Sequence, residues 1–134
     1  MSQSNRYNQS PAFAEELEQL ENYVKQSAID GIAIHTVELG IWRRVLEIGR
    51  SALGLYLSLQ GDGDVGEILA LETGQTVRRL PSVHRREYQS VFGGFSLERY
   101  VYGSRKGQKI EYAPLDSRLQ LPESKFSYLQ IGRA

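Results

Sequence analysis

Hydrophobic side chains recur at helical spacing along the first 60 residues, in two segments separated by a short turn. The hydrophobic positions of the first segment are Phe13, Leu17, Leu20 and Val24. Their steps of four, three and four residues place them on one face of an α-helix. We predict that this helix begins at Pro11 and ends before Gly31, because proline suits a first turn and glycine suits a C-cap.

The second segment predicts a longer helix, which begins near Thr36 as N-cap and runs to about Gln60. One hydrophobic stripe along it consists of Ile41, Val45, Ile48, Ala52, Leu55 and Leu59. A second stripe consists of Trp42, Leu46, Gly49, Leu53 and Tyr56. A helix with two hydrophobic faces needs two partners. The first helix, folding back through the turn at Gly31, can cover one face, and the downstream sheet or a second subunit must cover the other.

From Glu67 onward the spacing changes to the alternation that is typical of β-strands. The run EILALETGQTVRRLP predicts two strands joined by a turn at Thr73–Gly74. FSLERYVYG, at residues 95–103, predicts a further strand, although Arg99 falls on its hydrophobic side. The two sides of that strand are Phe95, Leu97 and Val101, and Glu98, Tyr100 and Tyr102. GSRKG predicts a hairpin tip, and a return strand follows until Pro114, which cannot donate a ladder hydrogen bond.

These elements predict an α+β fold. Its expected parts are a disordered tail at residues 1–10, a helical hairpin at 11–60, a linker at 61–66, a basic β-hairpin and sheet region at 67–118, and the start of a helix at 119–134. In the last part, Pro122 and Glu123 suit a first helical turn, and Phe126 and Leu129 begin a hydrophobic stripe. The expected architecture is a helical hairpin with a long second helix, then a small, mostly antiparallel sheet and a short C-terminal helix.

Charge is divided unevenly between the halves of the chain, although the net charge of the 134 residues is zero. Residues 1–74 carry five basic and eleven acidic side chains, a net of −6, and residues 75–134 carry eleven basic and five acidic ones, a net of +6. This asymmetry indicates nucleic-acid or membrane contact by the basic half, or attraction between the halves. Membrane insertion is disfavoured, because Arg43, Arg44 and Arg50 lie in the middle of the long helix.

The sequence offers no convincing catalytic or metal centre. The absence of cysteine excludes disulfides and thiolate zinc sites. Asp62 and Asp64 do not begin an EF-hand loop, because Glu67 stands where that loop needs glycine, so a solvated linker is the better interpretation. His35 and His84 stand alone in the sequence. We therefore expect no cofactor, no metal and no enzymatic activity, and the N-terminus, which lacks a signal-peptide pattern, predicts a cytoplasmic protein.

The strongest functional signal is a set of basic residues in the predicted sheet region. They are Arg78, Arg79, Arg85, Arg86, Arg99, Arg105, Lys106 and Lys109, interleaved with Tyr88, Tyr100, Tyr102 and Tyr112. Arginine binds phosphate bidentately, a narrow β-hairpin fits a DNA groove, and tyrosine rings stack on unpaired bases. The alternative is a solvated sheet face whose tyrosines favour strand formation. Composition alone leaves these two interpretations open.

Five segments, in their order and spacing, resemble a known family. They are VELGIWRRVLEIGRSALGLYLSLQGDGDVGE at 37–67, SVFG at 90–93, FSLERYVYG at 95–103, PLD at 114–116 and LQLPESKFSYL at 119–129. Together they resemble the N-terminal region of bacterial insertion-sequence transposases of the ISKra group, over most of residues 36–130. In that family the region precedes a ribonuclease-H-like domain with an Asp-Asp-Glu metal site. The resemblance therefore implies element-end recognition and assembly rather than strand cutting.

The resemblance also implies what this chain lacks. GSRKG stands where related transposases often carry a Cys-x-x-Cys zinc knuckle, so a zinc-stapled hairpin is not implied. We expect a transposase N-terminal piece from a truncated or frame-disrupted element, with no catalytic domain. LQLPESKFSYL resembles the segment that leads into the missing domain. IGRA matches nothing that we associate with the family, so we expect it to be a product of the truncation. The expected activity is binding of double-stranded DNA at element ends, through the eight basic residues, by a nucleoid-associated protein.

A homo-oligomer is expected, because transposition pairs two element ends. The residues expected to support it are Ile41, Trp42, Val45, Ile48 and Leu55. An alternative function is a protein-interaction module, in which the helical hairpin oligomerises and the basic sheet docks on acidic helices. Such a module could co-assemble with full-length transposase. A third alternative is a fragment that folds poorly and exposes Phe126, Tyr128 and Leu129.

Overall fold

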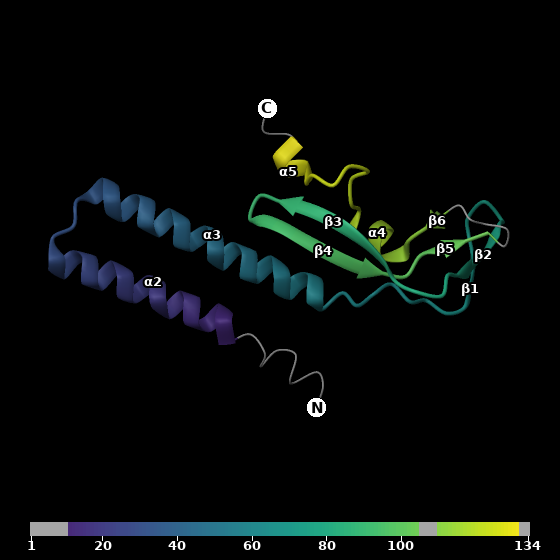
Figure 1. Cartoon of the computed structure of the whole chain (residues 1–134), viewed down its shortest axis with the longest axis horizontal. Helices are drawn as coiled ribbons and strands as arrows, with labels where there is room; N and C mark the ends of the chain where they lie inside the picture. The colour runs from purple at the N-terminus through teal and green to yellow at the C-terminus, as the bar shows by residue number, and fades with distance from the viewer. Residues whose placement is uncertain (1–10, 105–109, 132–134) are drawn as a thin grey trace. The chain divides into compact units, whose positions relative to one another are not determined.

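The computed structural model describes residues 11–104 and 110–131, and the chain divides into two compact units at residues 59 and 60. Within this described part, the first unit contains two helices, and the second contains six strands and two short helices (Figure 1). In chain order the elements are α2 Pro11–Asp30, α3 Ile34–Ser58, β1 Ile68–Ala70, β2 Thr76–Arg79, β3 His84–Ser90, β4 Gly93–Arg99, β5 Tyr102–Gly103, β6 Ile110–Tyr112, α4 Pro114–Leu119 and α5 Tyr128–Ile131. The predicted α+β class is confirmed.

The first unit is the predicted helical hairpin, in which α2 and α3 run side by side and antiparallel (Figure 1). Gly31 follows α2 with φ 68°, and the next N–H, of Ile32, bonds to the carbonyl of Ser27 at 3.1 Å. This is a glycine C-cap of the Schellman kind. The predicted N-cap of α3 is wrong: α3 begins at Ile34 after an extended Ala33, and Thr36 lies inside its first turn.

The contact between α2 and α3 is close and centred on Tyr23. A Cβ atom added at Gly40 would lie 1.9 Å from Tyr23 Oη, so the tyrosine ring occupies the space that a larger side chain would fill. Tyr23 Oη donates to the carbonyl of Thr36 at 3.4 Å. The guanidinium of Arg44 lies 3.8 Å from the centroid of the Tyr23 ring, which is a cation–π distance.

A further polar contact joins the two helices, since Ser51 Oγ donates to Glu16 Oε1 at 2.6 Å. Leu20, four positions after Glu16 on the same side of α2, is half-buried. By contrast, Leu17 is 51% exposed and Trp42 is 58% exposed. All side chains of α3 are described, and none of them is buried. Thus α2 leaves both predicted stripes of α3 at least partly open.

The second unit contains a four-stranded antiparallel sheet in the order β1-β2-β5-β6 and a two-stranded antiparallel sheet of β3 and β4. The predicted hairpin of β1 and β2 is confirmed, with Gly74 at φ 92° in its turn. The predicted pairing of strands on either side of GSRKG is also confirmed, since β5 pairs with β6, while residues 105–109 themselves lie outside the described part.

The prediction of one continuous strand at residues 95–103 is wrong. β4 ends at Arg99, and the chain passes from the two-stranded to the four-stranded sheet before β5 begins at Tyr102. Between them, the N–H of Tyr100 bonds to the carbonyl of Asp62 at 2.9 Å, and the carbonyl of Val101 accepts from Leu80 at 2.9 Å. The simple alternation is lost at this change of sheet, so Val101 and Tyr102 are both buried.

The core of the second unit is small. Its buried hydrophobic residues are Val77, Leu97, Val101, Tyr102 and Leu115. They come from β2, β4, β5, α4 and the change of sheet, so each element contributes about one side chain. A core of this size leaves a large share of stability to polar contacts.

The predicted start of the C-terminal helix at Pro122 is wrong. An unexpected helix, α4, begins with Pro114 in its first turn and ends at Leu119, and its C-cap, Gln120, has φ 55°. The chain then runs beside β3: the carbonyl of Lys125 accepts from Gln89 at 2.7 Å, and the N–H of Ser127 donates back to Gln89 at 2.9 Å. These bonds use the backbone groups that a helix from Pro122 would need, and α5 begins only at Tyr128.

The segment GDGDVG at 61–66, predicted as a linker, has no helix or strand but is bonded to the second unit. Tyr102 Oη donates to the carbonyl of Gly66 and accepts from the N–H of Val65 at 3.0 Å. Within the segment, the carboxylates of Asp62 and Asp64 each accept a backbone N–H two residues ahead. These carboxylates therefore organise a turn against the sheet.

Candidate nucleic-acid interface

The eight basic residues predicted to bind DNA divide into three groups. Arg105, Lys106 and Lys109 lie outside the described residues. Arg79, Arg85, Arg86 and Arg99 form ion pairs with carboxylates. Arg78 is exposed, and no ion pair joins it to any residue that the structure describes.

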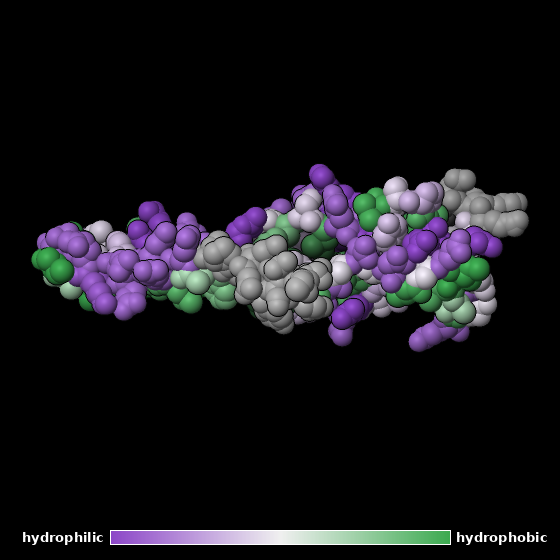
Figure 2. Space-filling model, turned by 90° about the horizontal axis from the view of Figure 1, so that it is seen from below, coloured by the Kyte–Doolittle hydropathy of each residue, from purple (hydrophilic) through white to green (hydrophobic). Residues whose placement is uncertain are grey.

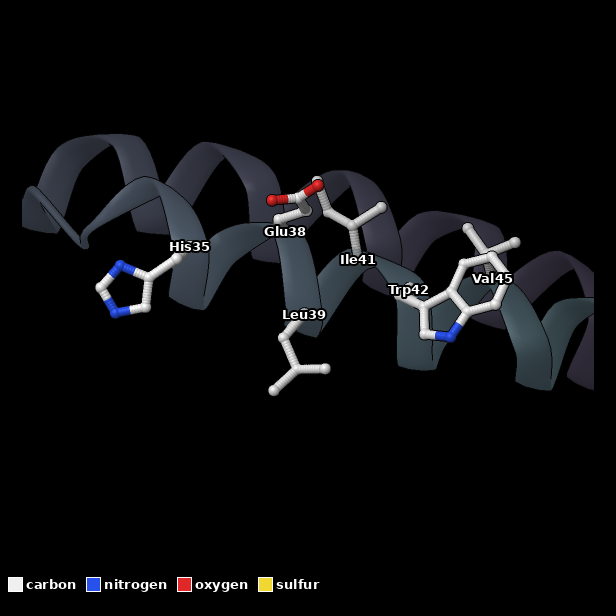
Figure 3. Close-up of a pocket in the computed structure, with 6 residues that line it drawn as sticks. All are labelled: His35, Glu38, Leu39, Ile41, Trp42 and Val45. Carbon is white, nitrogen blue, oxygen red and sulfur yellow. The ribbon is translucent and has the colours of Figure 1, made fainter.

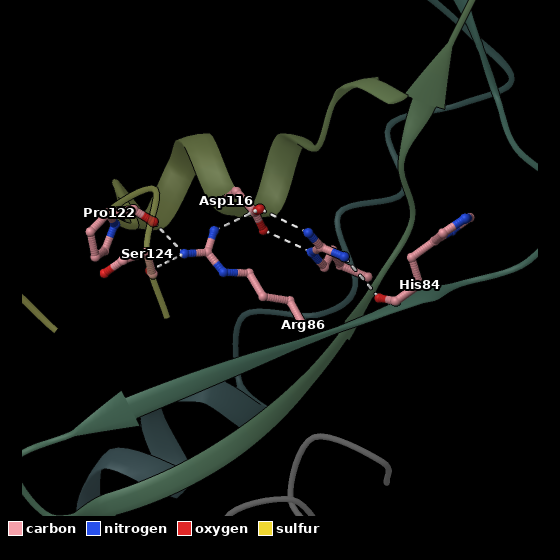
Figure 4. Close-up of polar contacts among 6 residues, drawn as sticks. His84, Arg86, Asp116, Pro122 and Ser124 are labelled. Carbon is pink, nitrogen blue, oxygen red and sulfur yellow. Dashed lines mark hydrogen bonds and ion pairs between the residues drawn. The ribbon is translucent and has the colours of Figure 1, made fainter. Parts of the chain in front are cut away.

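Arg86 and Arg99 converge on the carboxylate of Asp116, from β3, β4 and α4 (Figure 4). Arg99 binds it bidentately, with Nε–Oδ1 at 2.9 Å and Nη2–Oδ2 at 3.0 Å. Arg86 Nη1 lies 3.1 Å from Oδ2. The side chains of Arg99, Arg86 and Asp116 are 12%, 16% and 22% exposed. We call this group the Asp116 clamp.

The remaining donors of the Asp116 clamp hold backbone carbonyls. Arg99 Nη1 donates to the carbonyl of His84 at 3.0 Å, and Arg86 Nη2 donates to those of Ser124 at 2.9 Å and Pro122 (Figure 4). The clamp thus fastens α4 and the segment after it to the β3–β4 sheet. Both arginines have a structural role that accounts for their position.

The charges of the clamp determine the protonation of Asp116. Burial alone would raise the pKa of this carboxyl group, but the hydrogen bonds and positive charge of Arg99, followed by those of Arg86, outweigh burial. The pKa of Asp116 is therefore lowered from its ordinary value of 3.8. Asp116 is ionised at neutral pH, and the clamp carries two positive charges and one negative charge.

Arg79 is also held by a carboxylate, that of Asp64. Its Nη1 lies 2.7 Å from Asp64 Oδ1, and its guanidinium lies 5.6 Å from the Tyr100 ring centroid. The N–H of Gly66 and the guanidinium of Arg79 lower the pKa of Asp64, in that order of effect. Arg79 therefore stabilises the turn formed by residues 61–66.

The outward face of β3 and β4 is of mixed charge. Arg85 lies directly opposite Glu98, with 3.8 Å between Nη2 and Oε2, and both side chains are well exposed. On the same face, Ser96 Oγ donates to Glu87 Oε2 at 3.0 Å. This face carries one basic and two acidic side chains, so the hairpin is not the uniformly basic surface that the sequence suggested.

Arg78 occupies a different position. It lies opposite Ile68 on one neighbouring strand and Gly103 on the other, and Gly103 in turn pairs with Ile110. Its side chain is exposed, while that of the preceding Val77 is buried. Since Gly103 and Ile110 flank residues 104–109, Arg78 lies on the strand beside the base of the basic GSRKG tip.

Of the four tyrosines predicted to interleave with these arginines, Tyr102 is unable to stack on a base. It is buried, and its hydroxyl bonds to the backbone at Val65 and Gly66. Tyr88, Tyr100 and Tyr112 are partly exposed.

A second candidate surface lies on the first unit. An open groove of about 470 Å³ runs along one face of α3 (Figure 3). We call it the α3 groove, and it is lined by His35, Glu38, Leu39, Ile41, Trp42 and Val45. Figure 2 shows hydrophobic surface at the turn end of this hairpin, where Ile29 and Ile34 are among the most exposed side chains.

The described residues contain no group of three or more His, Asp or Glu side chains placed to hold a metal ion. In the same residues, no helix is both long and apolar enough to cross a membrane. No family model, curated protein or solved structure matches the chain.

Asp116 is a structurally important residue that the sequence interpretation missed. In the sequence interpretation it was noted only as the aspartate of the PLD segment at 114–116. A signal for it existed, since Arg99 fell on the hydrophobic side of its strand, and a cation at a partly buried position needs a carboxylate partner. The identity of that partner depended on the placement of α4, which the sequence did not predict.

Proposed function

We propose that the second unit binds the phosphate backbone of double-stranded DNA through the GSRKG tip and Arg78. The observation that carries this proposal is the position of Arg78, an exposed arginine beside the base of a tip that contains Arg105, Lys106 and Lys109. Arg79, Arg86 and Arg99 are excluded from this proposed site, because their guanidinium groups are already held by carboxylates.

The chemistry of the site supports phosphate contact rather than base recognition. Arg78 and the three cations that lie between β5 and β6 in the sequence attract the DNA backbone, and their binding releases condensed counterions. The glycines at 103 and 107 carry no side chains that would separate these cations from the duplex. Together with the resemblance to ISKra-group transposases, this supports a non-catalytic role in binding the ends of a mobile element.

The direct test is a fluorescence anisotropy titration of the full chain onto a labelled duplex at several low salt concentrations. We expect binding whose affinity falls steeply with salt. Absence of binding at the lowest salt concentration would contradict the proposal.

A second candidate function is a protein-interaction module, which the exposed α3 groove favours. Sedimentation of the chain with and without duplex DNA distinguishes the two functions. An assembly that forms but does not sediment with DNA would support the interaction module alone.

A further inference from the structure

Three exposed hydrophobic residues of the helical hairpin, Leu17 and Val24 of α2 and Val45 of α3, lie on the same side of it. On α2, Leu17 and Val24 each follow by one position a residue of the interhelical contact, Glu16 and Tyr23. One position is a rotation of about 100° around the helix axis. Leu17 and Val24 are therefore displaced together to one side of the contact.

The same offset occurs on α3. Ile41, Val45 and Ala52 each follow by one position a contact residue, and those contact residues are Gly40, Arg44 and Ser51. Because α2 and α3 are antiparallel and face each other, an equal rotation on both helices leads to the same side. These offset residues of α2 and α3 thus lie next to each other and form one continuous surface, which we call the hairpin face.

We propose that a second copy of the chain covers the hairpin face and that the two hairpins form a four-helix dimer. The contact between α2 and α3 uses other positions, so the hydrophobic residues of the hairpin face remain available to a partner. Leu17, Val24 and Val45 are each at least 40% exposed. A two-helix surface of this kind is half of a four-helix bundle core.

The size of the hairpin face suits a weak, reversible dimer. A 20-residue helix is about 30 Å long, and two helices side by side are about 20 Å wide. The face therefore offers about 600 Å² per copy, somewhat less than the roughly 800 Å² of a standard interface. We expect a dimer that dissociates on dilution into the micromolar range.

The helix charges select one of two symmetric arrangements. α2 carries one basic and five acidic side chains, and α3 carries three basic and two acidic ones. A two-fold axis parallel to the helices places α2 on the partner's α3, whereas an axis across them places α2 on the partner's α2. The second arrangement brings two helices of net charge −4 together, so charge favours the first.

The favoured arrangement brings specific residues together. Lys25 and Glu38 lie toward the outer edges of the hairpin face, on α2 and α3. Tyr23 contacts Gly40 and Arg44, so these residues lie at the same height along the hairpin axis. Lys25 and Glu38 therefore differ in height by no more than about one helical turn. In the favoured dimer, Lys25 lies near the partner's Glu38, whereas within one copy these side chains are on opposite edges.

Sedimentation velocity of the full chain, from low micromolar to several hundred micromolar concentration, tests the dimer. We expect a concentration-dependent dimer whose dissociation constant rises at least tenfold in Val45→Glu and in Leu17→Glu. Arg43→Glu is the matched control, because Arg43 precedes Arg44 and lies on the opposite side of the contact. Far-ultraviolet circular dichroism verifies that helix content is unchanged. A monomer at every concentration, or variants that dimerise like the wild type, would overturn the proposal.

Cysteine cross-linking tests the arrangement, since the chain contains no cysteine of its own. A mixture of Lys25→Cys and Glu38→Cys chains is expected to form a mixed disulfide on oxidation. Glu21→Cys, near the middle of α2, reports the alternative arrangement by forming a disulfide with itself. A disulfide only in the Glu21→Cys sample would overturn the charge-selected arrangement, and a dimer that forms neither would overturn the hairpin face as the interface. Both tests omit DNA, so they fail independently of the proposed function.

Discussion

Arg99 binds Asp116 with two parallel hydrogen bonds, at 2.9 and 3.0 Å, across the contact between β4 and α4. The second arginine of the clamp, Arg86, joins the same carboxylate to β3. A unit with few buried hydrophobic residues thus has a polar cross-link between its two-stranded sheet and α4. We infer that the clamp fixes the C-terminal segment rather than a ligand.

Removal of the carboxylate is expected to destabilise the second unit. Asp116→Ala leaves two mostly buried guanidinium groups without their partner, and we expect a loss of about 2–3 kcal/mol in the free energy of unfolding. Urea denaturation followed by tyrosine fluorescence measures this loss, because the single tryptophan lies in the first unit. Glu98→Ala is the matched control, because its exposed pair with Arg85 contributes less than about 1 kcal/mol. Equal losses in both variants would contradict the structural role of the clamp.

The clamp also predicts a dependence of stability on pH. The pKa of Asp116 is lower in the folded chain than its ordinary value of 3.8, so the folded state favours the ionised form. Its contribution is therefore fully present above the unfolded pKa and is lost as pH falls below about 4 toward the folded pKa. Urea midpoints measured from neutral pH downward should decline less steeply below pH 4 in Asp116→Asn. An identical decline in both proteins would contradict this assignment.

The fit between Tyr23 and Gly40 predicts non-additive substitutions. Alanine is a better helix former than glycine by about 1 kcal/mol, so Gly40→Ala should stabilise α3 by about that amount in a Tyr23→Ala background. In the wild-type background the new methyl group meets the tyrosine ring, and the gain should be reduced or lost. Thermal unfolding monitored by circular dichroism gives the four values of this cycle. Equal effects of Gly40→Ala in both backgrounds would show that the two residues do not touch.

The C-terminal segment should be protected from hydrogen exchange in a strand-like pattern. The N–H groups of Gln89 and Ser127 are both bonded across the contact with β3. We expect slow exchange at these two amides by nuclear magnetic resonance, and faster exchange of both in Asp116→Ala, which releases the segment. Continuous protection from Lys125 through Ser127 with fast exchange at Gln89, as expected for a helix that begins at Pro122, would support the original prediction instead.

The periodic parts of the chain were predictable from sequence, because helix and strand spacing is a local property. The helical hairpin, the turn at Gly74 and the α+β class follow from it. The direction in which the hydrophobic stripes point was not predictable from this spacing. The spacing cannot show that Tyr23 and Gly40, rather than Leu17 and Val45, face the opposite helix.

The basic set shows a second limit of sequence interpretation. Arg78 and Arg79 are adjacent and chemically identical, yet alternation along β2 exposes one and directs the other toward Asp64. Arg86 and Arg99 meet their partner, Asp116, only because α4 forms. This helix has six residues and no clear hydrophobic periodicity, so the sequence did not predict it. The use of a charged residue depends on long-range pairing, so composition alone overstated the surface available to DNA.

The salt dependence of DNA affinity tests the central claim that Arg78 and the GSRKG tip bind phosphates. For each phosphate that a variant no longer neutralises, the slope of log affinity against log salt should become shallower by about one. We predict this change in Arg78→Ala, a doubled change in Arg78→Ala with Lys106→Ala, and none in Arg118→Ala, an exposed arginine on α4. An unchanged slope in the double variant, or an equal change in Arg118→Ala, would contradict the account.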